Sequence, residues 1–173
     1  MSTRVWPMRR GLMVTSGFRT ADRPDHWGID IGWPGGSAGL PVFAAQAGIC
    51  TAGPAQGFGQ WVLVDHPTEA GGGLTVYGHI IPEVVTGQWV EAGQRIAQIN
   101  PDPRTNGGVP PHLHFEVHRY RWSYPGPDRL EPLAWLDASP YAEDPPPGAA
   151  PPAIDDEATW AAIAEQQMGP PSA

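Results

Sequence analysis

Apolar and polar residues alternate along residues 112–118, which read His-Leu-His-Phe-Glu-Val-His. Successive side chains of a β-strand point to opposite faces, so this period of two predicts a strand. Leu113, Phe115 and Val117 would face a core, whereas the histidines and Glu116 would share the other face. Two charged imidazoles on one face repel each other, so a metal ion or a shared proton is the usual reason to place them together. Taken alone, the motif leaves a solvated polar strand face as the alternative.

Short apolar runs, separated by turns that contain Gly or Pro, continue this pattern through most of the chain. Gly and Pro number 22 each among 173 residues, which disfavours long helices. The pattern is typical of an all-β protein with an antiparallel sheet or barrel-sandwich core, whose long loops would wall a groove. The predicted strands are Leu12–Thr15, Ile29–Ile31, Val42–Ala45, Trp61–Asp65, Leu74–Tyr77, Trp89–Val90, Ile96–Ile99 and His112–His118.

The length of the chain suits one small domain, which we expect to occupy residues 1–143. Residues 144–152 are rich in Pro and predict a semi-rigid linker. Residues 153–173 predict an acidic tail with a short helix over Ile154–Met168. That helix would either dock on the domain or begin a further module.

The charge is distributed unevenly along the chain. Residues 1–127 hold nine acidic side chains and nine arginines, whereas residues 128–173 hold nine acidic side chains and one arginine. The net charge of −8 therefore belongs to the last segment, and no basic patch points to nucleic acid. Lysine is absent. A biotinyl or lipoyl carrier domain, whose hairpin Val84–Ile96 resembles, is thereby excluded because it needs an acceptor lysine.

His26 and Asp30 lie four residues apart, in a segment where Gly28 and Pro34 argue against a helix. A turn that enters a short strand would instead bring the two side chains together. With His114 they provide two nitrogen donors and one oxygen donor, the kind of set that catalytic zinc prefers, and a fourth position stays open for water. The sequence therefore predicts one zinc ion held by His26, Asp30 and His114.

His79 and His112 remain once these three ligands are assigned. His79 follows the predicted strand Leu74–Tyr77, and a structural histidine at a strand end is the alternative for it alone. A hydrolytic zinc site needs a group that takes a proton from water and delivers it to the leaving amine, and it benefits from a donor to the oxyanion. The two spare histidines fit these tasks.

Taken together, these motifs resemble the lysostaphin-like (LytM-type) zinc metalloendopeptidases, which cut peptidoglycan cross-bridges. The resemblance covers residues 12–137, and each motif stands in the order that the family shows. The matching segments are Ser16–Arg19, His26–Ile31, Pro41–Ala45, Gly57–Gly59, Val62–His66, Tyr77–His79, Val84–Ile96, Pro111–Val117 and Glu131–Leu133.

The resemblance implies that His26, Asp30 and His114 hold zinc, that His112 is the general base, and that His79 steadies the tetrahedral intermediate or passes the proton on. The family usually has Thr-Gly-Pro before the first histidine of this pair, whereas this chain has Val109-Pro110-Pro111. We therefore expect an unusual loop beside the substrate groove and an altered cleavage specificity.

Two other functions fit parts of the pattern. Two histidines and a carboxylate also describe a non-haem iron oxygenase, although its first pair is normally spaced His-x-Asp and it has no use for His79 and His112. A catalytically inactive wall-binding or structural module on the same fold is the second alternative. Such a module would be expected to lose site residues, and this chain keeps all of them.

The expected partner is the peptide part of peptidoglycan, and we expect a monomer without a membrane span. The single cysteine, Cys50, allows no intramolecular disulfide, and the N-terminus lacks the apolar stretch of a secretory signal. We therefore expect a phage lysin or lysin module, made in the host cytoplasm and acting at the wall after release, or carried by the virion. Absence of lysine hints at a GC-rich actinobacterial host with diaminopimelate-type walls, where Arg104, Arg119 or Arg121 could bind a carboxylate.

Overall fold

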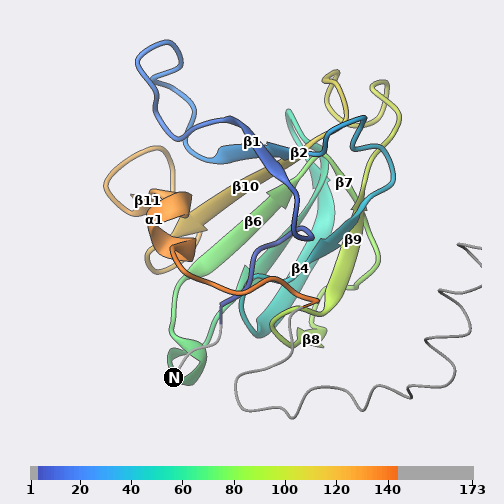
Figure 1. The fold of residues 1–173 in the computed structure, drawn as a ribbon. Coiled ribbons are helices and arrows are strands. Elements are labelled where there is room, and N and C mark those ends of the chain that lie inside the picture. Colours follow the sequence, from blue (N-terminus) through green and yellow to red (C-terminus); the bar gives the residue numbers. More distant parts are fainter. Residues whose placement is uncertain (1–3, 144–173) are drawn as a thin grey trace, which may run out of the picture. The chain divides into compact units, whose positions relative to one another are not determined.

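The structure, a computed structural model, describes residues 4–143, and residues 1–3 and 144–173 lie outside the described part. The described residues form two antiparallel β-sheets, a short 3₁₀ helix at Thr68–Ala70 and the helix α1 at Pro132–Leu136 (Figure 1). The larger sheet contains β1 (Met13–Ser16), β2 (Ile29–Gly32), β4 (Gly48–Ala55), β5 (Gly59–Asp65), β6 (Leu74–Gly78), β8 (Trp89–Val90), β10 (Leu113–His118) and β11 (Arg129–Leu130). The smaller sheet contains β3 (Pro41–Phe43), β7 (Ile80–Pro82) and β9 (Arg95–Ile99).

The larger sheet has the order β1-β2-β10-β6-β5-β4-β8, with β11 paired to β10, and the smaller sheet has the order β3-β9-β7. The main hydrophobic core combines side chains from both sheets, because each sheet turns one apolar face inward. Ile29 of β2, Tyr77 of β6 and Phe115 of β10 meet Val42 of β3 and Ile96 of β9 in this core, and all five are fully buried. The fold therefore confirms the prediction of an all-β, antiparallel architecture.

The eight predicted strands are all present, with ends displaced by at most two residues. One detail of the prediction for residues 112–118 is wrong, because His112 precedes β10 instead of belonging to it. The alternative of a solvated polar face is excluded, since His114, Glu116 and His118 are buried. The polar side chains on that face must therefore find their partners inside the protein.

The sequence pattern missed the strands β4, β7 and β11 and the helix α1. The residues of β4 read Gly-Ile-Cys-Thr-Ala-Gly-Pro-Ala, and such small residues with an internal Pro are usually a sign against a strand. The helix α1 is one of the segments that periodicity cannot detect, because it has only five residues. It begins at Pro132, and the Glu131 carboxylate caps it by accepting hydrogen bonds from the backbone N–H groups of Leu133 and Ala134.

A row of directly paired residues crosses the larger sheet and positions the candidate site. Asp30 of β2 pairs with His114 of β10, which pairs with Gly78 of β6, which in turn pairs with Trp61 of β5. Paired residues of neighbouring antiparallel strands project from the same face of a sheet. We call Asp30, His114, Gly78 and Trp61 the cross-sheet row.

The chain divides into two units, residues 1–143 and residues 144–173. The predicted Pro-rich linker and the predicted helix over Ile154–Met168 lie outside the described residues. Within residues 4–143, no helix is both long enough and apolar enough to cross a membrane.

Candidate metal centre

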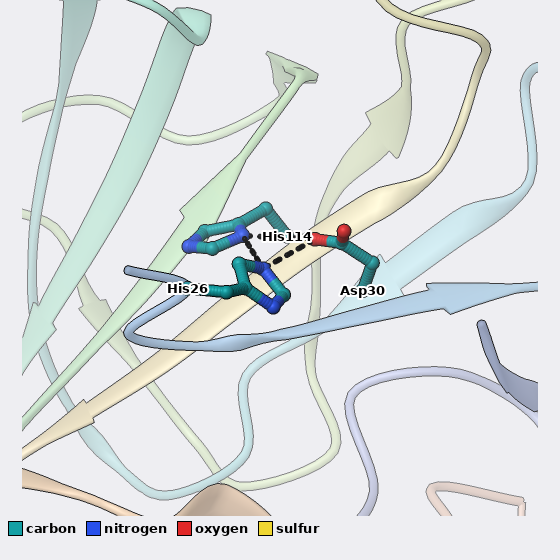
Figure 2. A group of neighbouring side chains, drawn as sticks. All are labelled: His26, Asp30 and His114. Carbon is teal, nitrogen blue, oxygen red and sulfur yellow. Dashed lines mark hydrogen bonds and ion pairs between the residues drawn. The ribbon is translucent and has the colours of Figure 1, made fainter. Parts of the chain in front are cut away.

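His26, Asp30 and His114 converge on one point, although 84 residues separate Asp30 from His114 (Figure 2). Asp30 Oδ1 lies 3.0 Å from His26 Nε2 and 2.9 Å from His114 Nδ1, and the two nitrogens lie 3.2 Å apart. All three residues are buried. The structure thus brings together the three residues that the sequence predicts as metal ligands.

The spacing and chemistry of these atoms fit a tetrahedral zinc ion. Zinc binds imidazole nitrogen and carboxylate oxygen at about 2.0–2.2 Å, which places two ligand atoms of a tetrahedron roughly 3.3 Å apart. The observed separations of 2.9–3.2 Å are close to that value. Three protein donors also leave one tetrahedral position open, as in catalytic zinc sites.

Strand pairing and a glycine bring the three ligands together. Asp30 and His114 are direct neighbours on β2 and β10. His26 lies in the turn that leads into β2, and this turn approaches β10 closely at Gly28. A side chain at Gly28 would place its Cβ 2.7 Å from His114 Nε2 and 2.6 Å from the Phe115 carbonyl oxygen. Only glycine therefore allows the His26 turn to lie against the strand that carries His114.

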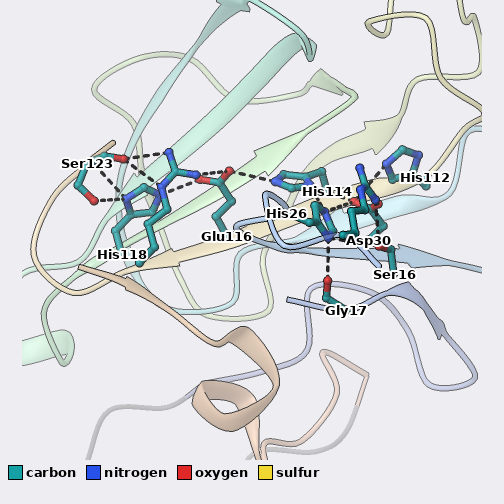
Figure 3. Close-up of polar contacts among 11 residues, drawn as sticks. Ser16, Gly17, His26, Asp30, His112, His114, Glu116, His118 and Ser123 are labelled. Carbon is teal, nitrogen blue, oxygen red and sulfur yellow. Dashed lines mark hydrogen bonds and ion pairs between the residues drawn. The ribbon is translucent and has the colours of Figure 1, made fainter. Parts of the chain in front are cut away.

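The outward-facing atom of each candidate ligand is bound by the protein (Figure 3). His26 Nδ1 donates to the Gly17 carbonyl at 2.8 Å, and His114 Nε2 donates to Glu116 Oε1 at 3.0 Å. Asp30 Oδ2 accepts a hydrogen bond from Arg23 Nη1 at 2.6 Å. Such outer partners orient each imidazole so that its inward-facing nitrogen, which contacts Asp30 Oδ1 here, can bind a metal once it is deprotonated. His26 Nε2, Asp30 Oδ1 and His114 Nδ1 are thereby the available donor atoms.

The partner of His114 belongs to a buried polar chain along β10. Glu116 Oε2 accepts from His118 Nε2 at 2.8 Å, and Glu116 Oε1 also accepts from Arg129 Nη1 at 2.8 Å. The backbone N–H of Ser123 donates to His118 Nδ1 at 3.0 Å. The chain His114–Glu116–His118–Ser123 therefore runs from the metal centre to the loop between β10 and β11 (Figure 3).

Two buried carboxyl groups, Glu116 and Asp30, have a lowered pKa because neighbouring histidines bind them. Burial alone would raise the pKa of Glu116, but hydrogen bonds from His114 and His118 outweigh burial and lower it to about 2. Burial would also raise the pKa of Asp30, yet the bonds to His112, His114 and His26 hold it well below its usual range. Both carboxyl groups are thus ionised at neutral pH, which suits a site that holds a cation.

His79 and His112, the predicted catalytic residues, lie beside this centre with their rings 4.6 Å apart. His79 Nδ1 donates to the Asn106 carbonyl at 2.6 Å, and His112 Nδ1 donates to the Pro110 carbonyl at 2.8 Å. Burial lowers the pKa of His79 to about 4, so its ring is neutral at pH 7. The His79 ring therefore presents an Nε2 lone pair that can accept a proton, and His112 Nε2 lies 3.4 Å from Asp30 Oδ1.

The backbone of His79 adopts the left-handed region, with φ of 62°. A non-glycine residue with positive φ is uncommon and is found most often where the surrounding structure holds it for a purpose. The hydrogen bond to Asn106 fixes the His79 ring on the 100–110 loop. Asn106 is fully buried and also binds the backbone of Val109, so the Pro- and Gly-rich loop is built around one amide side chain.

Phe58 forms an apolar wall of the centre that the sequence reasoning did not identify as a site residue. Its ring stacks on His114, with centroids 5.0 Å apart, and meets His79 edge-on at 5.0 Å. The ring occupies the space above Gly78, where a Cβ would lie 2.6 Å from Phe58 Cδ1. The signal in the sequence is Gly78 itself, because a glycine inside a strand often marks a close approach by another group.

A groove of about 520 Å³ adjoins the centre on the side of β1 and β2. Asp30 and His112 line it together with Met13, Trp33 and Pro111. The groove gives a substrate access to the space beside the candidate ligands.

The sequence did not predict a role for Arg23 or Glu116, because the partners of both side chains become apparent only in the folded structure.

The family model described as Peptidase family M23 matches residues 24–125. This segment contains all five predicted site residues, namely His26, Asp30, His79, His112 and His114. A comparison with curated proteins gave no match.

Solved structures share the fold at low sequence identity. The SpoIIQ–SpoIIIAH pore-forming complex matches with a TM-score of 0.57 and 22% identity, over 78% of this chain and 90% of that chain. Lysostaphin from Staphylococcus simulans, described as an antimicrobial peptidase, matches with a TM-score of 0.66 and 22% identity, over 89% of this chain and 61% of its own. The catalytic domain of the prophage-encoded M23 protein EnpA from Enterococcus faecalis matches with a TM-score of 0.55 and 21% identity, over 76% of this chain and 95% of its own.

Proposed function

The chain belongs to peptidase family M23, and we propose that it is a zinc-dependent endopeptidase that hydrolyses peptide bonds in bacterial peptidoglycan. The convergence of His26, Asp30 and His114 carries the proposal. Their inward atoms lie 2.9–3.2 Å apart, while the protein binds their outward atoms. Two imidazoles and one carboxylate beside an open position are a donor set of catalytic zinc in peptidases.

When bound, zinc would supply Lewis acidity, which polarises a carbonyl oxygen and lowers the pKa of water. The protein's own groups would move the protons as the new C–O bond forms and the C–N bond breaks. His112 Nε2, 3.4 Å from Asp30 Oδ1, would accept a proton from the attacking water and deliver it to the leaving nitrogen. His79 would stabilise the oxyanion only after its Nε2 takes up a proton, because its Nδ1–H is engaged by Asn106.

The choice of peptidoglycan rests on resemblance and on shared fold. The motifs of the chain resemble lysostaphin-like peptidases, and lysostaphin itself is described as an antimicrobial peptidase. We further propose that the protein is a phage lysin, either made in the host cytoplasm and released at lysis or carried by the virion. The fold shared with the prophage-encoded EnpA supports this origin.

A structural module without catalysis is the second candidate. The fold shared with the SpoIIQ–SpoIIIAH pore-forming complex favours it, because that assembly is described by its pore and not by hydrolysis. The arrangement of His79 and His112 supports the enzyme instead. Each imidazole is held through its Nδ1 beside the metal centre, so that its Nε2 stays outside those bonds, an arrangement that hydrolysis can use.

Metal analysis combined with digestion of purified peptidoglycan tests the proposal. We expect one zinc per chain and release of new amino groups from the wall peptides, both abolished by a chelator and restored by zinc. His66→Gln is a matched control, since His66 is a buried histidine outside the site that binds Ala47 and Thr75. Zinc binding without hydrolysis would favour the structural module, and bound iron with oxygen consumption would favour the oxygenase.

A further inference from the structure

Aromatic rings continue from the metal centre along the outer face of the larger sheet. Phe58, which stacks on His114, lies 6.4 Å from Trp61, and Trp61 lies 6.4 Å from Trp122 in an edge-on contact. Trp122 in turn meets Tyr124 at 4.9 Å. We call Phe58, Trp61, Trp122 and Tyr124 the aromatic stripe. It begins at the cross-sheet row, because Trp61 and His114 project from the same face on either side of Gly78.

The far end of the aromatic stripe is exposed. Trp122 and Tyr124 are 36% and 79% exposed, and the neighbouring Tyr120 is 68% exposed. With Arg121, Ser123 and Asp128 they line a pocket of about 600 Å³. Large aromatic side chains that gather at an exposed pocket usually mark a binding surface, because aromatic rings otherwise gain free energy by burial.

The loop that carries Trp122 and Tyr124 is held in place by buried polar groups. Arg129 donates from Nε and Nη2 to the Ser123 carbonyl at 3.0 and 2.9 Å, and the Ser123 N–H donates to His118 Nδ1. The backbone of Arg119 closes the loop by donating to the Asp128 carbonyl at 2.7 Å. A ligand would therefore meet rings that are already in position, which reduces the entropy lost on binding.

We propose that the aromatic stripe and its pocket bind the sugar chain to which the wall peptides are attached, so that the substrate is a glycan-linked peptide and not a free peptide. This inference rests on the proposed function. A pyranose ring has an apolar C–H face, which packs on an indole or phenol ring, and a polar edge that needs hydrogen bonds. The stripe itself carries no charge, whereas Asp128 and the tyrosine hydroxyls at the pocket can bind hydroxyl and acetamido groups.

The position of the stripe gives the substrate a direction. The groove that Asp30 and His112 help to line lies on the β1 side of the centre, and the stripe lies on the β5 side. A peptide whose scissile bond lies at the centre would extend into the groove with one end. Its other end would lead past Phe58 toward the sugar on Trp122.

Steady-state kinetics on two matched substrates test the inference. One is a cross-linked wall peptide with its disaccharides, and the other is the same peptide after an amidase has removed the sugars. For Trp122→Ala and Tyr124→Ala we expect KM on the glycan-linked substrate to rise about tenfold, the scale of one lost aromatic contact, with kcat unchanged. KM on the sugar-free peptide should not change. Trp89→Ala is the control, because Trp89 is 45% exposed on β8 and lies outside the stripe.

The outcomes separate this inference from the proposed function. An equal rise in KM on both substrates would assign the stripe to the peptide, and unchanged KM on both would show that the stripe binds no substrate. Either result overturns the inference while hydrolysis by the unaltered protein persists. Binding of a soluble β-1,4-linked N-acetylglucosamine oligomer, followed by tryptophan fluorescence, needs no hydrolysis. It should weaken in Trp122→Ala and persist in Trp89→Ala, and its absence from the unaltered protein would also contradict the inference.

Discussion

Arg23 holds one carboxylate oxygen of Asp30 away from the metal centre. Its Nη1 lies 2.6 Å from Asp30 Oδ2 and 2.9 Å from the Ser16 hydroxyl oxygen. The other oxygen, Oδ1, faces the nitrogens of His26 and His114 at 3.0 and 2.9 Å. The carboxylate is thereby oriented to offer a single oxygen to an ion, which keeps the remaining coordination positions open for water and substrate.

Arg23→Gln should weaken zinc binding by about 10–100-fold, the usual effect of removing an outer partner of a metal ligand. Competition with a chromogenic chelator measures this affinity. Arg95→Gln is the control, because Arg95 makes a comparable ion pair with Glu83, 2.6 Å apart, outside the site. Equal zinc affinities for Arg23→Gln and the unaltered protein would show that Arg23 is not required to orient the Asp30 carboxylate for zinc binding.

Substitutions of the histidines should separate metal ligands from catalytic residues. His114→Ala should lose zinc, because it removes one of three converging donors. His79→Ala and His112→Ala should keep zinc and lose about 10²-fold or more in kcat, the scale of an acid–base or oxyanion group. Metal analysis and turnover of the same preparations measure both effects. Loss of zinc from His112→Ala, with retention in His114→Ala, would mean that the two roles are exchanged.

Stability should fall as the pH decreases from about 6.5 to about 4, and His66 should contribute to this fall. Burial lowers the pKa of His66 in the folded protein from 6.5 to about 4. Below pH 6.5 the unfolded chain therefore binds a proton that the folded chain does not, and protonation favours unfolding. Thermal unfolding of metal-free protein between pH 7 and pH 4.5 measures the effect. Tm of His66→Gln should decrease less steeply over this interval, and parallel curves would contradict the assignment.

Alternation of apolar and polar residues was sufficient to predict most of the fold. Leu113, Phe115 and Val117 pack into the core as their spacing requires, because a strand with one face in a core has only one register that buries its apolar residues. The strand β4 escaped prediction since its small residues carry little hydrophobic signal, although pairing with β5 and β8 stabilises it in the fold. Long-range pairing of this kind is not visible in a local pattern.

The candidate ligands could be predicted, whereas their supporting partners could not. Donor chemistry and the spacing of His26 and Asp30 were informative because few other side chains bind zinc. Arg23 carries no such signal, since an arginine on an irregular segment is usually solvated. Its role depends on the folded turn that brings it within 2.6 Å of Asp30. Glu116 was placed on the polar face of its strand, but its contacts with Arg129 depend on the return of the chain along β11.

Truncation after Asp144 should leave Tm, zinc content and activity unchanged, because the described strands and the candidate site all precede it. Truncation after Asp137 is the contrasting variant. It removes Tyr141, whose ring stacks on Trp6 at 5.9 Å, and Glu143, which accepts a hydrogen bond from the Arg10 backbone at 2.7 Å. We expect this shorter protein to have a lower Tm. A large decrease in Tm after the longer truncation would instead show that the acidic tail belongs to the fold.

The protein should hydrolyse diaminopimelate-type walls faster than walls with pentaglycine bridges. Diaminopimelate adds a free carboxylate to the peptide segment that joins the scissile bond to the sugar, and an arginine is the side chain best suited to bind it. Arg104 is already paired with Asp102 at 2.8 Å, and Arg119 lies 3.9 Å from Asp128. Arg121, which lines the pocket together with Trp122 and Tyr124, forms no ion pair with any residue in the range 4–143.

Of the three arginines, Arg121 is therefore the best candidate for the substrate carboxylate. Equal amounts of enzyme on the two wall types, followed by mass analysis of the released peptides, give the preference directly. Arg121→Gln should reduce the rate on diaminopimelate walls and leave the slower rate on pentaglycine walls unchanged. A glycine bridge has no side-chain carboxylate, so it makes no contact with Arg121 that the substitution could remove. Arg104→Gln serves as the control for removal of one surface charge, since its guanidinium is already occupied by Asp102. Faster release of peptides from pentaglycine walls by the unaltered protein would reverse the assignment. An equal decrease in rate for Arg121→Gln and Arg104→Gln would show that only the loss of a positive surface charge matters, and not a contact of Arg121 with the carboxylate.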